Sequence, residues 1–193
     1  MLVMKRINCR NIVIVLLSTV LSHAPLSYGS EDKSAEVAQY ALESIQTRLD
    51  IEVEILKSFA YNKVFSCALY QITPWMKNPD GSKESSGSYV VIDTGDGFAA
   101  LVSPKNDETN SQLIACFKGD FVVNSDEDAM ILLHALGSVT DDDVTTEAKV
   151  MKSAEGWQLA TGTFFDSFKG YQVKTDSAGK VLLINYAMEL PAI

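Results

Sequence analysis

The sequence is poor in the residues from which many enzyme active sites are built. It contains three cysteines and two histidines in 193 residues, and only His134 lies beyond residue 29. A single histidine excludes, within one chain, the sites that need two histidine ligands, which include the common catalytic zinc centres. Any Ser-His-Asp or Cys-His mechanism must use His134. Its position beside Met130, at the edge of an apolar helix face, favours a partly buried structural histidine.

Sequence motifs for nucleophiles and cofactors are absent as well. The chain has no Gly-x-Ser-x-Gly elbow, phosphate-binding loop, Gly-x-Gly-x-x-Gly or Cys-x-x-Cys motif. A dyad of His134 with Cys67 or Cys116 remains an alternative, but it competes with a disulfide between the two cysteines. We therefore expect no cofactor, and an enzyme is the less favoured class.

Basic side chains are scarce relative to acidic ones. The chain has 25 Asp and Glu against 16 Lys and Arg, and three of the basic residues precede residue 30. The remainder therefore carries 13 basic against 25 acidic residues, a net charge of about −12. This charge repels nucleic acid and anionic membranes, because both are bound through Lys and Arg. We expect neither partner; the acidic surface suits a basic protein, or it serves solubility.

The first 29 residues predict a secretory signal peptide. Three basic residues come before an almost purely apolar run, Ile12–Leu21, and the small residues Ser27 and Gly29 fit a cleavage site before Ser30. The run is shorter than the roughly 20 residues that span a bilayer, so an uncleaved anchor is the less favoured alternative. We expect residues 30–193 to form a single exported domain, periplasmic or extracellular.

Two cysteines, Cys67 and Cys116, remain after cleavage. An even pair in an exported domain is typical of a disulfide, with two free buried thiols as the alternative. Both lie in strand-like runs, so a bridge between neighbouring strands fits the pattern. It would close a loop of about 50 residues and stabilise the fold by roughly 4 kcal/mol in the chain-entropy description.

The N-terminal part of the remaining chain predicts a long amphipathic helix. Apolar residues recur at spacings of three and four from Ala38 to Ala60, and Ser34 fits an N-cap. The predicted helix spans residues 34–60 and is about 40 Å long. Asp50–Ile55, with the sequence DIEVEI, alternates with period two and is a strand in the alternative interpretation.

The chain from Lys63 onward has mainly strand-like patterns. We expect strands at 63–73, 88–93, 98–103, 112–123, 146–154, 157–165, 170–175 and 180–188, with a polar loop at 78–87. Pro74 is expected to end the first of these strands. A second helix is predicted at 126–136, because Ser125 and Asp128 form a capping-box-like start and Gly137 is a typical stop.

These elements predict an α+β fold, in which the long N-terminal helix packs on a curved antiparallel β-sheet and the second, short helix covers one end. The arrangement resembles cystatin-like and nuclear-transport-factor-like folds in outline. The resemblance covers the layout and no motif, and such folds carry many functions. It therefore implies an architecture and no activity.

The segment YVVIDTGDGFAALVSP, residues 89–104, makes Asp93 a candidate catalytic carboxylate. Its Asp-Thr-Gly triplet resembles that of the retropepsins over the letters VVIDTG. Aspartic protease chemistry needs two carboxylates that share a proton, and the chain has no second triplet, so only a homodimer would supply it. Asp96 and Gly97 also stand where that family usually has Ala or Ser. A strand–DTGDG–strand pattern is typical of a hairpin turn, which we favour.

A short acidic run is a weak candidate for a Ca²⁺ site. It consists of Asp141, Asp142 and Asp143, and several carboxylates are the ligands that this hard cation prefers. The EF-hand spacing is missing, so a solvated acidic loop is the favoured interpretation.

A cluster of aromatic residues is the best candidate for a binding surface. Phe164, Phe165, Phe168 and Tyr171 lie within eight residues, and strand alternation places only some of them on one sheet face. Core packing is the favoured explanation; exposed at a loop tip, they would form a contact surface for a partner.

Taken together, these features predict an exported, non-enzymatic binding protein with an acidic surface: an inhibitor, a neutralising factor or an envelope accessory factor. The expected partner is a protein, with a basic one the best match. A small secreted hydrolase with a site around Asp93 or His134 is one alternative. A carrier with a small-ligand pocket between helix and sheet is the other.

Overall fold

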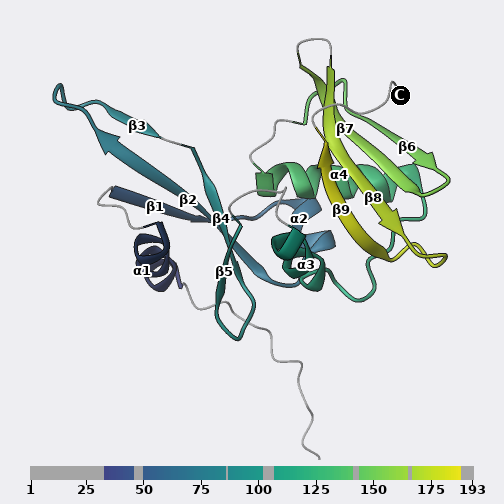
Figure 1. Cartoon of the computed structure of the whole chain (residues 1–193), viewed down its shortest axis with the longest axis horizontal. Coiled ribbons are helices and arrows are strands. Elements are labelled where there is room, and N and C mark those ends of the chain that lie inside the picture. The colour runs from purple at the N-terminus through teal and green to yellow at the C-terminus, as the bar shows by residue number, and fades with distance from the viewer. Residues whose placement is uncertain are drawn as a thin grey trace, which may run out of the picture.

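The computed structural model describes residues 33–45, 50–85, 87–101, 107–140, 144–164 and 167–187. The helices are α1 (Ser34–Ile45), α2 (Phe59–Val64), α3 (Asp107–Ala115) and α4 (Asp126–Thr140). The strands are β1 (Asp50–Ile55), β2 (Ala68–Lys77), β3 (Lys83–Ser85), β4 (Tyr89–Asp93), β5 (Phe98–Leu101), β6 (Lys149–Ser153), β7 (Gly156–Phe164), β8 (Ser167–Thr175) and β9 (Val181–Ala187). The predicted α+β class with antiparallel pairing is confirmed (Figure 1).

The strands form two sheets, where the sequence predicts one. The first has the order β1-β2-β4-β5, with β3 paired to β2, and the second has the order β6-β7-β8-β9. Figure 1 shows that the β2–β3 end of the first sheet points away from the second sheet. The four C-terminal strands lie where the sequence predicts them, because short turns join each to the next.

Helix α4 joins the two sheets through the main core. It packs against β6 and β7 of the second sheet, and against α2 and β4. Its buried residues are Ala129, Leu132, Leu133, Ala135, Leu136, Gly137 and Val139. This helix is longer than predicted, and Gly137 lies inside it. Gly137 does not adopt the positive φ of a C′ stop, because helix packing on several sides favours continuing the helix to Thr140.

The first sheet is covered on both faces at its centre. Val90 and Ile92 of β4 join the main core, together with Leu69 of β2. Val91 and Tyr70 point the other way, into a second cluster under α1. Burial on both faces explains why the run VVI is apolar without alternation, since each side of this strand meets a hydrophobic layer.

The predicted continuous helix over residues 34–60 is wrong at residues 50–58. Residues 50–55 form β1, the alternative interpretation of DIEVEI, and its exposure alternates along the strand. Ile51 and Val53 face the cluster under α1, so period-two burial decides the structure of this segment. A separate helix, α2, then begins at the N-cap Ser58, whose Oγ accepts the N–H of Tyr61 at 3.0 Å.

The predicted strand over residues 112–123 is also wrong, because α3 occupies its first part. Leu113 and Cys116, three residues apart, are buried in the main core, which is a helical spacing. Buried Asn110 donates from Nδ2 to the carbonyl of Ile184 at 2.9 Å. This bond attaches α3 to β9, a long-range contact that sequence spacing does not reveal.

The first predicted strand starts later and ends later than expected. Residues Lys63 and Val64 belong to α2, and β2 continues through Pro74 to Lys77. The pairing registers explain why proline is accepted here. Strand β2 pairs with β4 up to Ile72 and with β3 from Trp75 onward, so Pro74 lies between these ladders and its missing N–H breaks no bond to them.

The predicted disulfide is confirmed. Cys67 and Cys116 are bonded, with Cα atoms 5.2 Å apart and a sequence separation of 49. The bridge does not join neighbouring strands as predicted; it joins the residue before β2 to the end of α3. Ser66 supports it, since its N–H and its Oγ both donate to the carbonyl of Cys116, at 2.7 and 2.8 Å.

Candidate functional site

The most distinctive exposed feature of the first sheet is a row of carboxylates on β1. Asp50, Glu52 and Glu54 alternate with the partly buried residues of this strand and are all exposed. Successive side chains on one strand face lie about 7 Å apart. Because Ile51 and its alternate neighbours face α1, the carboxylates lie on the opposite face of the sheet.

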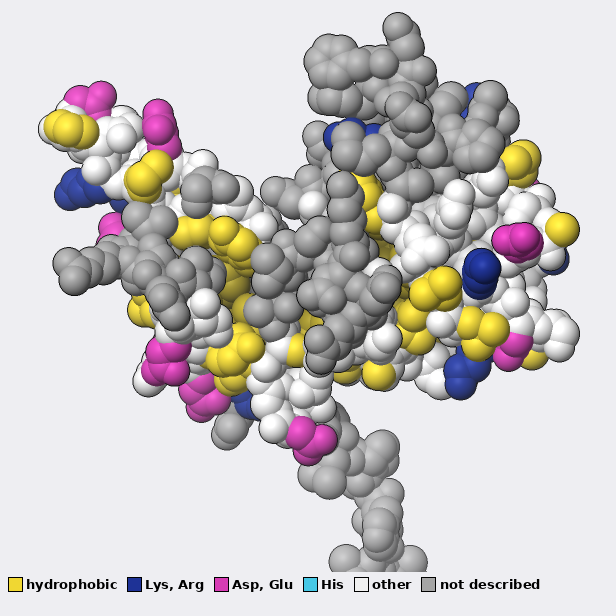
Figure 2. Space-filling model, viewed as in Figure 1, with side chains coloured by type: hydrophobic (Ala, Val, Ile, Leu, Met, Phe, Trp, Pro, Cys, Tyr) yellow, Lys and Arg dark blue, Asp and Glu magenta, His cyan; other side chains and the backbone are white. Residues whose placement is uncertain are grey.

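The neighbouring strand continues this face with polar and aromatic groups. Asp50 pairs with Trp75, Glu52 with Thr73, and Glu54 with Gln71. The indole Nε1 of Trp75 donates to Oε2 of Glu52 at 2.9 Å. We call Asp50, Glu52, Glu54 and Trp75 the acidic strand face. Figure 2 shows acidic side chains mostly over α1 and the first sheet in its view, and fewer over the second sheet.

A groove of about 740 Å³ lies between α2, the end of β1 and the β4–β5 turn. Its lining includes Lys33, Lys57, Tyr61, Phe65, Cys67 and Asp93. The hydroxyl of Tyr61 donates to the carbonyl of Cys67, and burial raises the pKa of Tyr61 to about 12. The phenol is therefore neutral at physiological pH and acts as a structural donor.

The interface between α1 and the first sheet contains a packed cluster. Its buried residues are Val37, Ala41, Tyr70, Ile72 and Val91. The groove lies beside this cluster, next to Lys33 at the start of α1. The carrier alternative expects a pocket between the long helix and the sheet; the groove lies at the edge of the interface between α1 and the first sheet.

Asp93 ends β4 and lies in the β4–β5 hairpin turn. Its Oδ1 accepts the N–H of Gly95 at 3.0 Å, and its Oδ2 is 2.8 Å from Nζ of Lys33. Burial raises its pKa, but these two donors and the charge of Lys33 outweigh it and hold the pKa below the ordinary value. The favoured hairpin turn is confirmed, with positive φ at Gly95 and Gly97.

The side chain of His134 is exposed on α4, so the prediction of a partly buried histidine is wrong. The buried residues of α4 provide its core face, and His134 lies outside that face. Both candidate dyad partners, Cys67 and Cys116, are used in the disulfide, so neither sulfur is a thiolate nucleophile. The structure brings no predicted catalytic partner to His134.

The aromatic cluster does not form the predicted surface at Tyr171. That residue is buried, its ring centroid lies 5.5 Å from that of Tyr186, and its hydroxyl hydrogen-bonds Oγ1 of Thr140 at 2.5 Å. Core packing, the favoured explanation, is correct for this residue because β8 alternation turns it toward α4. Phe164 and Phe168 lie in β7 and β8.

Four of the predicted site residues fall outside the described residues: Phe165, Asp141, Asp142 and Asp143. Within the ranges that are described, no group of three or more His, Cys, Asp or Glu side chains is arranged to hold a metal ion.

Sequence reasoning missed the acidic strand face because it favoured a helix there. The signal was present in DIEVEI, where every second residue is acidic and every other one is apolar. Interpreted as a strand, this pattern places three carboxylates on one face. As a helix it would place Asp50 and Glu54, four residues apart, on one side and Glu52 on the opposite side.

Comparisons with protein families, curated proteins and solved structures found no match for this chain. No helix in the described ranges has the length and apolar character needed to cross a membrane. The disulfide is consistent with an exported protein, since such bridges persist in oxidising compartments.

Proposed function

We propose that the protein is an exported, non-enzymatic binding protein whose partner is a basic protein, and that it serves as an inhibitor, a neutralising factor or an envelope accessory factor. The acidic strand face is the observation that supports this function. Asp50, Glu52 and Glu54 present three exposed carboxylates in a line on a sheet, in a chain with a net charge of −9. A rigid row of like charges matches Lys and Arg side chains at the same spacing.

The neighbouring tryptophan strengthens this proposal. Trp75 is fixed by its bond to Glu52, and it pairs with Asp50 across the strands. Tryptophan is enriched among the residues that contribute most to protein interfaces, because it combines a large apolar surface with one donor. The acidic strand face thus combines charges that select a basic partner with an aromatic contact.

The charges alone supply a limited affinity. An exposed ion pair contributes at most about 1 kcal/mol, so three pairs leave most of the binding free energy to other contacts. Complementary charge mainly raises the association rate and selects the partner. We therefore expect binding that weakens as salt is added, together with a component that salt does not remove.

Affinity capture from the chain's own envelope fraction tests this function. The immobilised protein is compared with the triple variant Asp50→Asn, Glu52→Gln, Glu54→Gln. A matched control, Asp96→Asn, Asp120→Asn, Glu155→Gln, removes the same charge from other exposed positions.

We expect a stoichiometric basic protein that binds the wild type and the control, is released by salt, and is lost from the first triple variant. Equal retention by both triple variants would contradict a role for the acidic strand face. No retained protein at low or high salt would contradict the function itself.

The groove beside α2 favours a second candidate, a small-ligand carrier. Its volume of about 740 Å³ falls in the range of roughly 300–1,000 Å³ typical of ligand sites. Tyr61 and Phe65 supply apolar lining, and Lys33, Lys57 and Asp93 supply charges. Native mass spectrometry of the purified protein checks this candidate: a co-purified small molecule supports it, and a mass equal to that of the chain alone counts against it.

A further inference from the structure

The outer edge of β1 carries main-chain hydrogen-bonding groups that no other strand among the described residues uses. The N–H of Leu56 donates to the carbonyl of Leu69 at 2.8 Å, so the main chain of Leu56 faces β2. Main-chain direction alternates along an antiparallel strand, and the residues of the same parity, Asp50, Glu52 and Glu54, therefore also face β2.

The main-chain groups of Ile51, Val53 and Ile55 consequently point to the outer edge. Strand β1 is the terminal strand of its sheet in the described part of the chain. Strand β5 at the opposite edge differs, because α3 packs against it. The β1 edge is therefore the more open of the two.

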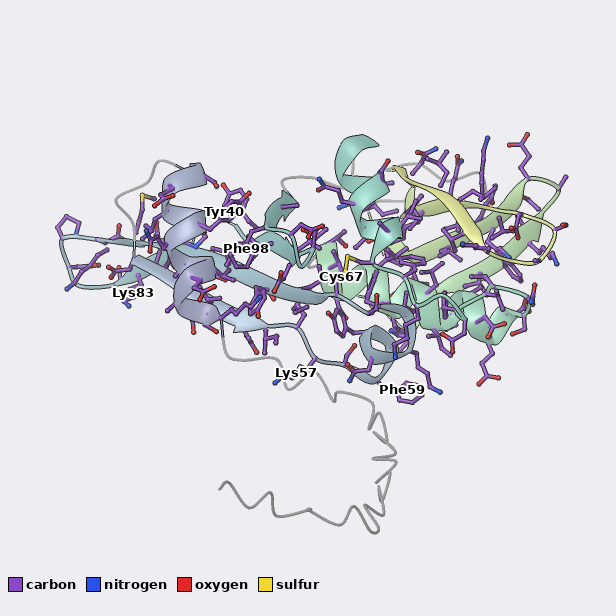
Figure 3. All side chains as sticks on the ribbon, turned by 90° about the horizontal axis from the view of Figure 1, so that it is seen from below. Tyr40, Lys57, Phe59, Cys67, Lys83 and Phe98 are labelled. Atoms are coloured by element: carbon purple, nitrogen blue, oxygen red, sulfur yellow. A yellow bond between two sulfur atoms is a disulfide. The ribbon has the colours of Figure 1, made fainter. Side chains whose placement is uncertain are left out.

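The two sides of this edge have different chemistry. The carboxylates of the acidic strand face line one side. Helix α1 lies on the other side, and Tyr40 identifies which flank of α1 faces which strand: its ring lies 5.4 Å from that of Phe98 in β5 (Figure 3).

The opposite flank of α1 therefore faces β1. In a helix with 100° between residues, Leu42 lies on the side of the axis opposite Tyr40. Leu42 is 39% exposed, so it offers an apolar contact beside the β1 edge. A strand added to this edge meets carboxylates on one face and an apolar helix flank on the other.

We propose that the β1 edge accepts an extended segment of the basic partner as an additional antiparallel strand, in which Lys or Arg alternates with apolar residues. This inference rests on the proposed function and specifies how the partner binds. The basic residues of the segment lie beside Asp50, Glu52 and Glu54. Its apolar residues lie opposite Ile51, Val53 and Ile55, below the flank of α1 that carries Leu42.

A second copy of this chain does not fit the edge. Pairing β1 with the β1 of another copy places two rows of carboxylates side by side, and like charges that face each other across strands are destabilising. Strand β6 contains Lys149 and Lys152, but residues three apart point to opposite faces of a strand. It therefore cannot present its two lysines to the same row of carboxylates.

The pairing geometry predicts which amides of the added strand are essential. In an antiparallel pair, the residues opposite Ile51, Val53 and Ile55 exchange both hydrogen bonds with them. These are the apolar residues of the partner segment. The amides of its Lys or Arg residues point away from β1, so blocking them leaves the ladder intact.

Three end-capped peptides test this geometry against the purified protein. The first is Lys-Val-Lys-Val-Lys-Val-Lys. The second carries N-methyl groups on its three valine amides, and the third carries them on the amides of its last three lysines, which matches the second in number and charge. Calorimetry measures affinity, and amide hydrogen exchange measures protection along β1.

We expect the unmodified peptide and the lysine-methylated peptide to bind with similar affinity, and the valine-methylated peptide to bind at least about tenfold more weakly, since three hydrogen bonds are lost. The unmodified peptide and the lysine-methylated peptide should slow exchange at the amides of Ile51 and Val53. The Asp50→Asn, Glu52→Gln, Glu54→Gln variant should weaken all three peptides, and the control triple variant should not.

Equal, salt-sensitive binding of both methylated peptides, with no protection on β1, would overturn strand addition and leave charge-led binding in place. No salt-sensitive binding of any peptide would overturn strand addition as well. In that case the carboxylates act only to prevent unwanted pairing at an exposed edge. If the affinity capture from the envelope fraction retains no partner protein, in contrast, the proposed function is rejected.

Discussion

The two sheets follow the same plan but have different surroundings. Each is preceded by a helix: α1 comes before the first sheet and α4 before the second. Helix α4 belongs to a core with 21 buried residues in the described chain, whereas five buried residues form the cluster under α1. The main core around α4 thus contains most of the buried hydrophobic residues of the described chain. The first sheet keeps an open edge and, at β1, an exposed row of carboxylates.

Their terminal strands also differ in charge. Strand β1 has the sequence DIEVEI and β6 the sequence KVMKS. Charged residues on exposed edges discourage accidental pairing, and both strands meet that need. Of these two strands, only β1 concentrates one charge sign on one face, which is the property on which the proposed partner selection depends. The difference places the larger core around α4 and the proposed binding surface on β1.

Removing the disulfide is expected to have the largest effect on this arrangement. The bridge links the residue before β2 with the end of α3, which packs on β9. The double variant Cys67→Ser, Cys116→Ser should lower the free energy of unfolding by about 4 kcal/mol, because it releases a loop of about 50 residues in the unfolded chain. Urea unfolding with and without the bridge measures this difference. If the free energy of unfolding falls by less than about 1 kcal/mol, the segment before β2 and the end of α3 are held together without the disulfide.

The next largest effect is expected from truncating a side chain in the main core. Leu132 is fully buried in α4, and Leu132→Ala should cost about 3 kcal/mol through lost burial and the cavity that remains. Because the core includes residues from both sheets, probes in either sheet should report the same unfolding transition. Separate transitions for Trp75 and Trp157 fluorescence would show that the sheets unfold independently. Single-tryptophan variants distinguish the two signals.

The matched truncation under α1 is expected to have a smaller and more local effect on stability. Val37 is fully buried beneath α1, and Val37→Ala should cost about 2 kcal/mol or less. Amide exchange should accelerate in α1 and β1 and remain slow in α4, because regions with few buried contacts open separately. Equal acceleration in α4 would contradict the division between a stable part and a binding part.

Local sequence signals predicted the parts of the fold that depend on neighbouring residues. The capping box at α4 is present, with the N–H of Asp128 donating to Oγ of Ser125 and the N–H of Ser125 donating to a carboxylate oxygen of Asp128. The C-terminal hairpins and the cysteine pair were predicted as well. Each of these depends on turn chemistry, capping or cysteine count, which are visible within a few residues or in the composition.

The misassigned segments depend on contacts between distant residues. Asp50–Ile55 matches helical spacing over a long window, and pairing with β2 makes it a strand. Helix α3 is fixed by the bond from Asn110 to Ile184, 74 residues away. The candidate site lies on one of these misassigned segments. Its geometry therefore required the structure, although its charge pattern was visible in the sequence.

The smallest predicted effect concerns the ion pair that connects α1 to the β4–β5 turn. Lys33 and Asp93 meet at 2.8 Å, and Asp93 has a pKa below its ordinary value of 3.8. A carboxyl whose pKa is lowered by folding stabilises the fold above the unfolded value and loses this contribution as the pH falls through the folded value. Asp93→Asn should therefore reduce stability by less than about 1 kcal/mol at pH 7, because the pair is partly exposed.

The effect of the same substitution should shrink as the pH falls below the unfolded pKa, and it should vanish once the pH lies below the lowered folded pKa, where Asp93 is protonated in both states. Urea unfolding across this pH range measures the difference, and Asp96→Asn in the same turn controls for the loss of a charge. Because the pair attaches α1 next to the groove, the destabilisation should appear first as faster amide exchange in α1. A destabilisation of equal size at pH 7 and pH 3 would assign the effect to the turn hydrogen bond with Gly95, and would show that the ion pair does not hold α1 in place.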